Sequence, residues 1–132
     1  MTREDFIALP DMAAEIQKRT AQVQRLRSRL TSPKGLDTRE KVQTSGGNNN
    51  MADVMVDMAA ELDALTCIYR DKLDEAAELI DTKLKDYPEL ILLTSLRYIK
   101  GAKWSDVTAV MGYSTSTVFR MKDQALELIF NN

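Results

Sequence analysis

The spacing of apolar residues predicts a first helix from about Pro10 to Leu30. Its apolar residues recur at a heptad-like interval, which Arg19 interrupts, at Leu9, Ile16, Val23 and Leu30. Pro10 suits the first turn of a helix because proline lacks the N–H that is unused there. A basic cluster near the end of this helix is interpreted as a solvated face that complements the helix dipole, with phosphate binding as the alternative.

A loop is predicted for the next segment, Thr31 to Asn50, because it contains Pro33, Gly35, Gly46, Gly47 and three consecutive asparagines. The glycines lack the spacing of a phosphate-binding loop, so nucleotide binding is not expected here. The composition favours a flexible connector. Contact of this loop with DNA or with a polymerase is the alternative.

A second long helix is predicted from about Met51 to Lys85. One apolar stripe with steps of three or four residues follows it, at Met51, Met55, Met58, Leu62, Leu65, Tyr69, Leu73, Ala76, Ile80 and Leu84. Acidic residues occupy the other faces and are interpreted as solvated. The stripe must be buried against something, and the first helix, folded back as an antiparallel hairpin, is its natural partner. Pairing with another subunit is the alternative.

Three more helical stretches are predicted in the C-terminal third of the chain. Pro88 breaks the preceding helix and opens the next, whose apolar residues are in helical phase at Leu90, Leu93, Leu96 and Ile99. Gly101 is expected to end that helix as a C-cap. The stretch "KWSDVTAVMGYSTSTVFRMKDQALELI" then contains two helical patterns divided at Met111 to Ser114.

These last two patterns meet the requirements of a helix-turn-helix. Gly112 stands where a left-handed backbone is needed, and Ser114 is a good N-cap for the second helix. Tyr113 is expected to pack. The apolar residues expected to point inward are Trp104, Val107 and Met111 in the first helix, and Val118, Met121, Ala125, Leu128 and Ile129 in the second. A helical hairpin with a serine cap and no DNA contact has the same spacing, so it remains an alternative.

The residues that open the second helix are candidates for DNA contact, because hydroxyls bond phosphates or base edges and an arginine fork can read guanine. The candidate DNA-binding residues are Ser114, Thr115, Ser116, Thr117, Arg120, Lys122 and Lys103. Arg97 or Lys100 is a further candidate for phosphate. No acid lies between Asp106 and Asp123, so nothing there repels DNA.

Charge and reactive residues narrow the function classes. The net charge is -2, but Met51 to Leu84 carries nine acidic residues against three basic ones, whereas the C-terminal part has a small positive excess. The chain has one cysteine, Cys67, and no histidine, so the usual zinc sites and histidine-based catalysis are excluded. We expect Cys67 to be a packed or half-buried structural residue, and we expect no enzymatic activity, metal or cofactor.

The N-terminus carries charges throughout and does not resemble a signal peptide. No window approaches the ~20 apolar residues that a membrane-spanning helix needs. A cytoplasmic protein with no membrane partner is therefore expected.

The C-terminal part resembles the sigma-70 region 4-like helix-turn-helix of phage regulators. The matching residues are Leu96, Arg97, Tyr98, Ile99, Gly101, Trp104, Val107, Met111, Gly112, Tyr113, Ser114, Val118, Arg120, Ala125 and Leu126. The upstream part, with "SP" at Ser32 and "KVQTSG" from Lys41, is similar to the RinA-like and ArpU-like activators. The resemblance covers nearly the whole chain and implies a phage or prophage transcription regulator of late genes.

The sequence thus predicts an all-α protein, with a long antiparallel helical hairpin in residues 1–86, a loop near residues 31–50, and a sigma-region-4-like helix-turn-helix in residues 87–132. The expected partner is double-stranded DNA, with host RNA polymerase and a second copy of the chain as further candidates. Two alternatives remain, an adaptor that docks on RNA polymerase and a small terminase-like DNA-packaging subunit.

Overall fold

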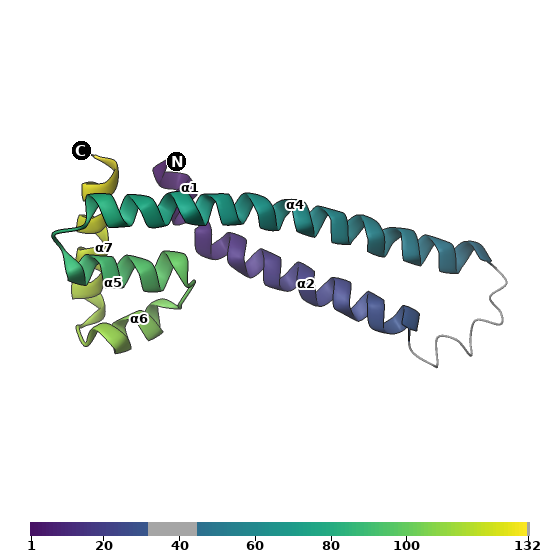
Figure 1. Ribbon diagram of the computed structural model, residues 1–132. Coiled ribbons are helices and arrows are strands. Elements are labelled where there is room, and N and C mark those ends of the chain that lie inside the picture. Colours follow the sequence, from purple (N-terminus) through teal and green to yellow (C-terminus); the bar gives the residue numbers. More distant parts are fainter. Residues whose placement is uncertain (32–44, 132) are drawn as a thin grey trace. The chain divides into compact units, whose positions relative to one another are not determined.

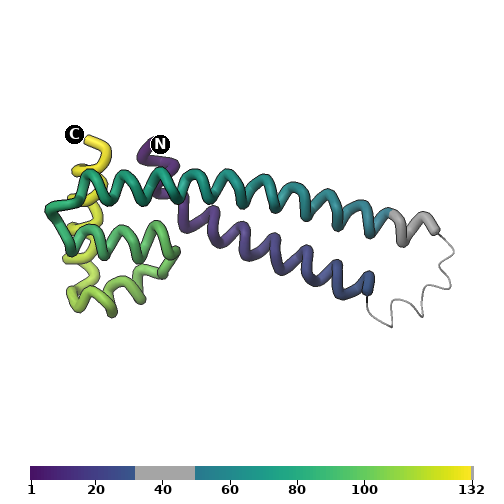
Figure 2. The backbone as a smooth tube through the Cα atoms, viewed as in Figure 1, coloured from purple at the N-terminus to yellow at the C-terminus, as the bar shows by residue number. Residues whose placement is uncertain are grey.

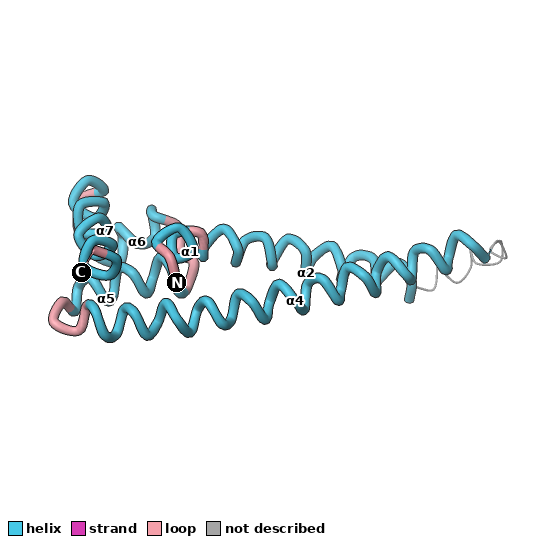
Figure 3. Tube along the Cα trace, turned by 90° about the horizontal axis from the view of Figure 1, so that it is seen from above, coloured by secondary structure: helices cyan, strands magenta, loops and turns pink. Residues whose placement is uncertain are grey.

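The computed structural model describes the backbone of residues 1–31 and 45–131 and the side chains of residues 1–31 and 50–131. Every element in these ranges is helical, which confirms the all-α class (Figures 1 and 3). The helices are α1 (Arg3–Ile7), α2 (Leu9–Thr31), α4 (Ser45–Lys83), α5 (Pro88–Thr94), the π-helical turn η1 (Ser95–Ile99), α6 (Trp104–Met111) and α7 (Thr115–Phe130). Among these described helices, none has both the length and the apolarity needed to cross a membrane.

The contacts divide the chain into two compact units. Unit 1 comprises Met1–Ala13 and Ile68–Asn132, and unit 2 comprises Ala14–Cys67. In the backbone trace of Figure 2, α2 and α4 are long helices that each contribute residues to both units. The sequence-based boundary lies elsewhere, between residues 86 and 87, because it separates the candidate DNA-binding part from the rest. That functional division stays a prediction.

Unit 1 begins with the short helix α1, which the apolar spacing does not predict. A capping box opens this helix, because the Thr2 hydroxyl accepts from the Asp5 N–H at 3.1 Å and the Asp5 carboxylate accepts from the Thr2 N–H. Lys72 of α4 lies 3.2 Å from Asp5, and its hydrogen bond, with those from Thr2, lowers the pKa of this carboxyl. The cap and the ion pair hold Phe6 in the core.

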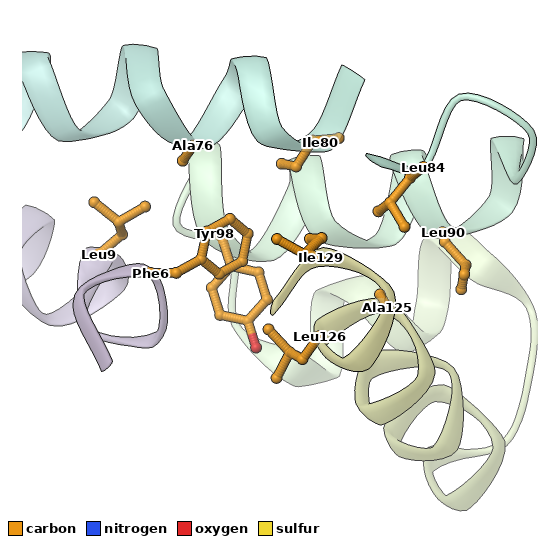
Figure 4. Packing of buried hydrophobic residues seen from close by; sticks show 10 residues of the cluster. All are labelled: Phe6, Leu9, Ala76, Ile80, Leu84, Leu90, Tyr98, Ala125, Leu126 and Ile129. Atoms are coloured by element: carbon orange, nitrogen blue, oxygen red, sulfur yellow. The ribbon is translucent and has the colours of Figure 1, made fainter. Parts of the chain in front are cut away.

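Two clusters of buried side chains form the core of unit 1. In the larger one the Phe6 ring lies 4.7 Å from the Tyr98 ring and 5.4 Å from the Phe130 ring, centroid to centroid. Its buried members come from six elements and from Leu84, which directly follows α4. They are Phe6, Leu9, Ala76, Ile80, Leu84, Leu90, Tyr98, Ala125, Leu126 and Ile129 (Figure 4). The smaller cluster joins Leu93, Val107 and Val118. Burial of Tyr98 raises its pKa to about 12.

The segment from Pro88 to Gly101 begins and ends where the sequence predicts, but its middle differs. Pro88 opens α5, and Gly101 has the left-handed φ of 72° expected of a C-cap glycine. Between them the helix widens into η1, in which the Lys100 N–H donates to the Ser95 carbonyl. Tyr98 is therefore buried, while the predicted stripe residues Leu96 and Ile99 are only half-buried.

Helix α4 begins at Ser45, so the prediction of a loop through Asn50 is wrong for Ser45 to Asn50. A glycine costs a helix about 1 kcal/mol relative to alanine, but extending an existing helix requires no new nucleus. Residues 32–44 of that predicted loop lie outside the described residues. The apolar stripe of α4 is confirmed, because none of its ten positions is exposed.

The expectation that Cys67 packs is also wrong, because its side chain is exposed. The reason is helical spacing. Cys67 lies two residues after Leu65 and two before Tyr69, so it points away from the half-buried stripe that these residues share.

In unit 2, α2 and α4 lie side by side (Figures 1 and 3). Arg19 of α2 contacts Glu15 at 2.8 Å and Glu61 of α4 at 3.7 Å, which explains why a charged residue interrupts the predicted heptad stripe. Hydrogen bonding lowers the pKa of Glu15 and raises that of Arg19. Val23 is fully buried, whereas Ile16, Leu26 and Leu30 are half-buried. The antiparallel hairpin itself stays a prediction that these contacts support.

Candidate nucleic-acid interface

Helix α6 is held against the rest of unit 1 by its apolar side. Val107 is fully buried, and the Trp104 ring packs edge-on against Tyr98 and Phe119, at 6.4 and 5.1 Å between centroids. Lys103 is the N-cap residue, and its carbonyl accepts from the N–H groups of Asp106 and Val107. The Lys103 side chain itself is exposed. The predicted inward residues of this helix are therefore confirmed.

The turn after α6 has the geometry that the sequence predicts. Gly112 adopts φ 77°, and its N–H donates to the Thr108 carbonyl at 2.9 Å. A Cβ at Gly112 would meet no atom within 4 Å, so the backbone conformation, not crowding, requires glycine here. Ser114 is the N-cap of α7, and its hydroxyl accepts from the Thr117 N–H at 3.3 Å.

The buried side of α7 is also as predicted. Val118 lies in the smaller cluster beside Val107 and Leu93, so this cluster joins α5, α6 and α7. Ala125 and Ile129 are buried in the larger cluster, together with Leu126, which spacing did not single out as inward. Packing on two sides sets the angle between α6 and α7 and leaves one face of α7 open.

The open face carries part of the candidate set. Thr115, Ser116 and Arg120 are exposed, and Ser116 lies one helical turn before Arg120. Thr117 is half-buried, and its hydroxyl accepts from that of Ser114 at 3.0 Å. The hydroxyls of Ser114 and Ser116 lie 3.3 Å apart. These three hydroxyls therefore already have partners within the first turn of α7.

Lys122 does not share the face of Arg120. Its side chain is 28% exposed, and its ammonium lies 3.2 Å from Asp123 and 5.4 Å from the Phe119 ring centroid. The structure thus groups Ser116 with Arg120 and places Lys122 to one side.

Arg97, a candidate for phosphate, is used inside the protein. Its Nη1 donates to the Ala102 carbonyl at 2.9 Å, its guanidinium lies 4.9 Å from the Trp104 ring centroid, and its Nε is buried without a partner. The side chain ties η1 to the start of α6. Lys100, the other residue considered for that role, is exposed.

Tyr113 differs from its expected packing role. Its ring is 42% exposed, and its hydroxyl donates to Glu89 of α5 at 2.9 Å, which raises the pKa of Tyr113. This hydrogen bond joins the loop between α6 and α7 to the first helical turn of α5. Beside it a groove of about 480 Å³ is lined by residues of the α4–α5 turn, α5 and α7, among them Thr117 and Gln124.

Three large apolar side chains of α6, the turn and α7 are exposed. They are Val110 at 60%, Tyr113 at 42% and Phe119 at 39%. Helical spacing could have indicated the exposure of two of them, because Val110 and Phe119 fall outside the apolar stripes of α6 and α7.

No protein-family model matches this chain, and neither do the sequences of curated proteins or the solved structures. The functional interpretation therefore depends on the residues and their geometry. Within the described residues, no group of three or more histidine, cysteine, aspartate or glutamate side chains could hold a metal ion.

Proposed function

We propose that the protein is a non-catalytic transcription regulator of the phage type, which binds double-stranded DNA through α6, the turn and α7 as a helix-turn-helix. One observation carries the proposal. A left-handed Gly112 ends α6, Ser114 caps α7 two residues later, and Val107 packs with Val118 across the turn. A helix-turn-helix requires this combination of turn, cap and inner contact.

The chemistry at the start of α7 supports contact with DNA. Ser116 and Arg120 are exposed on one side of its first two turns, and the first turn contains no carboxylate. The free N–H groups and the dipole at a helix N-terminus favour phosphate. Arg120 offers a guanidinium fork that can bond guanine or two phosphate oxygens.

The contact is confined to the N-terminal half of α7. Asp123 and Glu127 are exposed three and seven residues after Arg120, so they lie on the same side of the helix and would repel phosphate. Recognition helices also contact bases mainly through their N-terminal residues. Arg120 is therefore the strongest candidate for a base contact, and Lys103 is the strongest for phosphate.

The decisive experiment is a mobility shift with fragments of phage promoters, repeated over a range of salt concentrations. Affinity that falls steeply as salt rises would support the proposal, because bound phosphates release their counterions. Absence of any shift at low salt would refute it.

Replacing Arg120 tests the role of one residue. Arg120→Ala should weaken binding to the specific site by about 1–3 kcal/mol, which is the usual contribution of a bidentate base contact. Arg70→Ala is the matched control, since Arg70 is also exposed but lies on α4. Equal affinity of both variants for the specific site would show that Arg120 does not contribute to the interface.

A protein adaptor is the second candidate, with RNA polymerase as the partner to test first. The observation that favours it is the exposure of Val110, Tyr113 and Phe119, because exposed large apolar side chains can mark protein contacts. An adaptor without DNA contact would bind polymerase with no mobility shift, and Phe119→Ala would weaken that complex more than Arg120→Ala would.

A further inference from the structure

One face of unit 2 carries a shallow groove between α2 and α4. Two adjoining hollows, of about 320 and 250 Å³, share Gln22 and Met58 in their linings. Leu26 lines the first hollow and Val23 the second. Val54, one turn before Met58 on α4, is 49% exposed. The lining of this groove therefore includes the apolar side chains of Val23, Leu26 and Met58 beside the polar Gln22.

The two edges of the groove carry opposite charges. The α2 edge contributes three cations, Lys18, Arg25 and Arg29. The α4 edge contributes Glu61, and Asp57 and Asp53 precede it at steps of four residues, which continue the same row along the helix. In the described part of unit 2, α2 has five basic residues against Glu15, whereas α4 has four acidic residues and no basic one.

Most of these charges are not used within the chain. Arg19 and Glu61 form the ion pair between the two helices of unit 2, at 3.7 Å and with 39% and 69% of their side chains exposed. In the part of unit 2 that the structure describes, Arg25, Arg29, Asp53 and Asp57 form no ion pair. Exposed pairs of this kind contribute little, so the charge separation does not stabilise one copy appreciably.

We infer that this groove is a homodimer interface, in which a second copy of unit 2 covers it and forms a four-helix bundle. A two-fold axis parallel to the helices lays α2 of one copy over α4 of the other, and the converse. Each cationic edge then meets the acidic edge of the partner copy. An axis across the helices would instead lay α2 on α2, cation against cation.

The register of the charges also fits this arrangement. Residue numbers rise along α2 as they fall along α4, because Arg19 meets Glu61 while Leu26 and Arg29 share a hollow with Met58. A two-fold axis parallel to the helices leaves each residue at the same position along the bundle in both copies. Arg25 then reaches the level between Asp53 and Asp57 of the second copy, and Lys18 reaches the level of its Glu61.

The proposal does not depend on DNA binding, and its test uses the mass of the whole protein in solution. Light scattering during gel filtration at about 100 µM should give twice 14.9 kDa. Arg25→Glu with Arg29→Glu should weaken dimerisation at least about tenfold, since like charges would then face each other. Asp53→Arg with Asp57→Arg should do the same.

The sharpest result is a rescue. A mixture of the two double variants should restore the dimer as a one-to-one heterodimer, because each reversed edge again meets an opposite charge. The matched controls, Arg27→Glu and Asp63→Arg, reverse exposed charges outside the two rows and should leave the dimer intact. Circular dichroism of every variant checks that the helices persist.

Val54→Arg gives an independent test, because the exposed Val54 lies one turn before Met58, which lines both hollows. It should also prevent dimerisation without unfolding the chain, because Val54 is half exposed in one copy. A monomer for the unaltered protein at about 100 µM would overturn the proposal. A dimer that both double variants leave intact, or a mixture that stays monomeric, would overturn it as well.

Discussion

Unit 1 and unit 2 are built from the same two long helices but differ in how much they bury. In the stripe of α4, Ala76, Ile80 and Leu84 are fully buried in unit 1, whereas Met51, Met58 and Leu62 are only half-buried in unit 2. The sequence pattern is the same in both stretches. The difference comes from the number of neighbours, since α4 meets residues of five further elements in the larger core of unit 1 and one other helix in unit 2.

An amphipathic stripe therefore indicates which face of a helix is buried, but not how deeply that face is buried. Two helices enclose few side chains, and Val23 is the one buried residue among the described residues of unit 2. A layer of two helices therefore leaves most of its apolar groove open to solvent or to a partner. In unit 1, residues of α1, α2, α5, η1 and α7 enclose the core. Unit 2 lacks such a cover among its described residues, and the proposed dimer would provide it.

The largest expected effect is loss of the aromatic centre of unit 1. Phe6→Ala should destabilise the protein by about 3–5 kcal/mol, because a fully buried ring leaves a cavity between Tyr98 and Phe130. Urea unfolding followed by circular dichroism measures this. Glu4→Ala, an exposed neighbour in α1, is the control. A loss below about 1 kcal/mol would mean that α1 does not belong to the core.

The same truncation at two positions of the apolar stripe, Leu62 within α4 and Leu84 directly after it, tests the comparison. Leu84→Ala should cost about 2–5 kcal/mol, since Leu84 is fully buried, and Leu62→Ala should cost about half as much or less. Urea unfolding at a low protein concentration measures both. Equal costs would contradict the difference in burial, and a cost of Leu62→Ala that grows with concentration would indicate a cover supplied by a second copy.

Alkaline pH should act on unit 1 through Tyr98. Burial raises its folded-state pKa to about 12, above the usual tyrosine pKa of about 10, so the neutral form is favoured in the folded protein. The stability that this provides is complete below pH 10 and is lost as pH rises through about 12. Thermal unfolding of the unaltered protein and of Tyr98→Phe measures it. The variant should lose less stability over that interval, and parallel pH curves would contradict the assignment.

The smallest expected effect concerns the turn that closes the smaller cluster of unit 1. Gly112→Ala should destabilise the protein by about 1 kcal/mol, because a side chain disfavours φ 77° although space is available. Ala109→Gly, on the exposed side of α6, is a control for helix propensity. Thermal unfolding measures both, and an unchanged midpoint for Gly112→Ala would show that the turn tolerates other conformations.

Helical spacing predicted much of the fold. The predicted helix from Pro10 to Leu30 agrees with α2 within one residue at each end, and Pro88, Gly101, Gly112 and Ser114 stand at helix ends as expected. These signals are local, since each depends on one residue's backbone preference or on a repeat within one helix. The inward residues of α6 and α7 followed for the same reason.

The features that the sequence did not predict depend on longer-range packing or on short segments. Helix α1 is too short for a periodic signal, although threonine and aspartate three residues apart gave the capping box. The π turn and the interior role of Arg97 follow from how η1 meets Trp104. Among the candidate DNA-binding residues, spacing could not separate the exposed Arg120 from Lys122, which Asp123 and Phe119 engage.

The π turn at Ser95–Ile99 has a consequence for chain length. Its ring closes from Lys100 to Ser95, one residue more than the α-helical ring spans. Removal of one residue in this segment can be absorbed by conversion to an α turn. The same deletion within α4 would rotate every later residue of its stripe by about 100°. Proteins that share this fold are therefore expected to differ by single-residue insertions or deletions between α5 and Gly101, but not within α4.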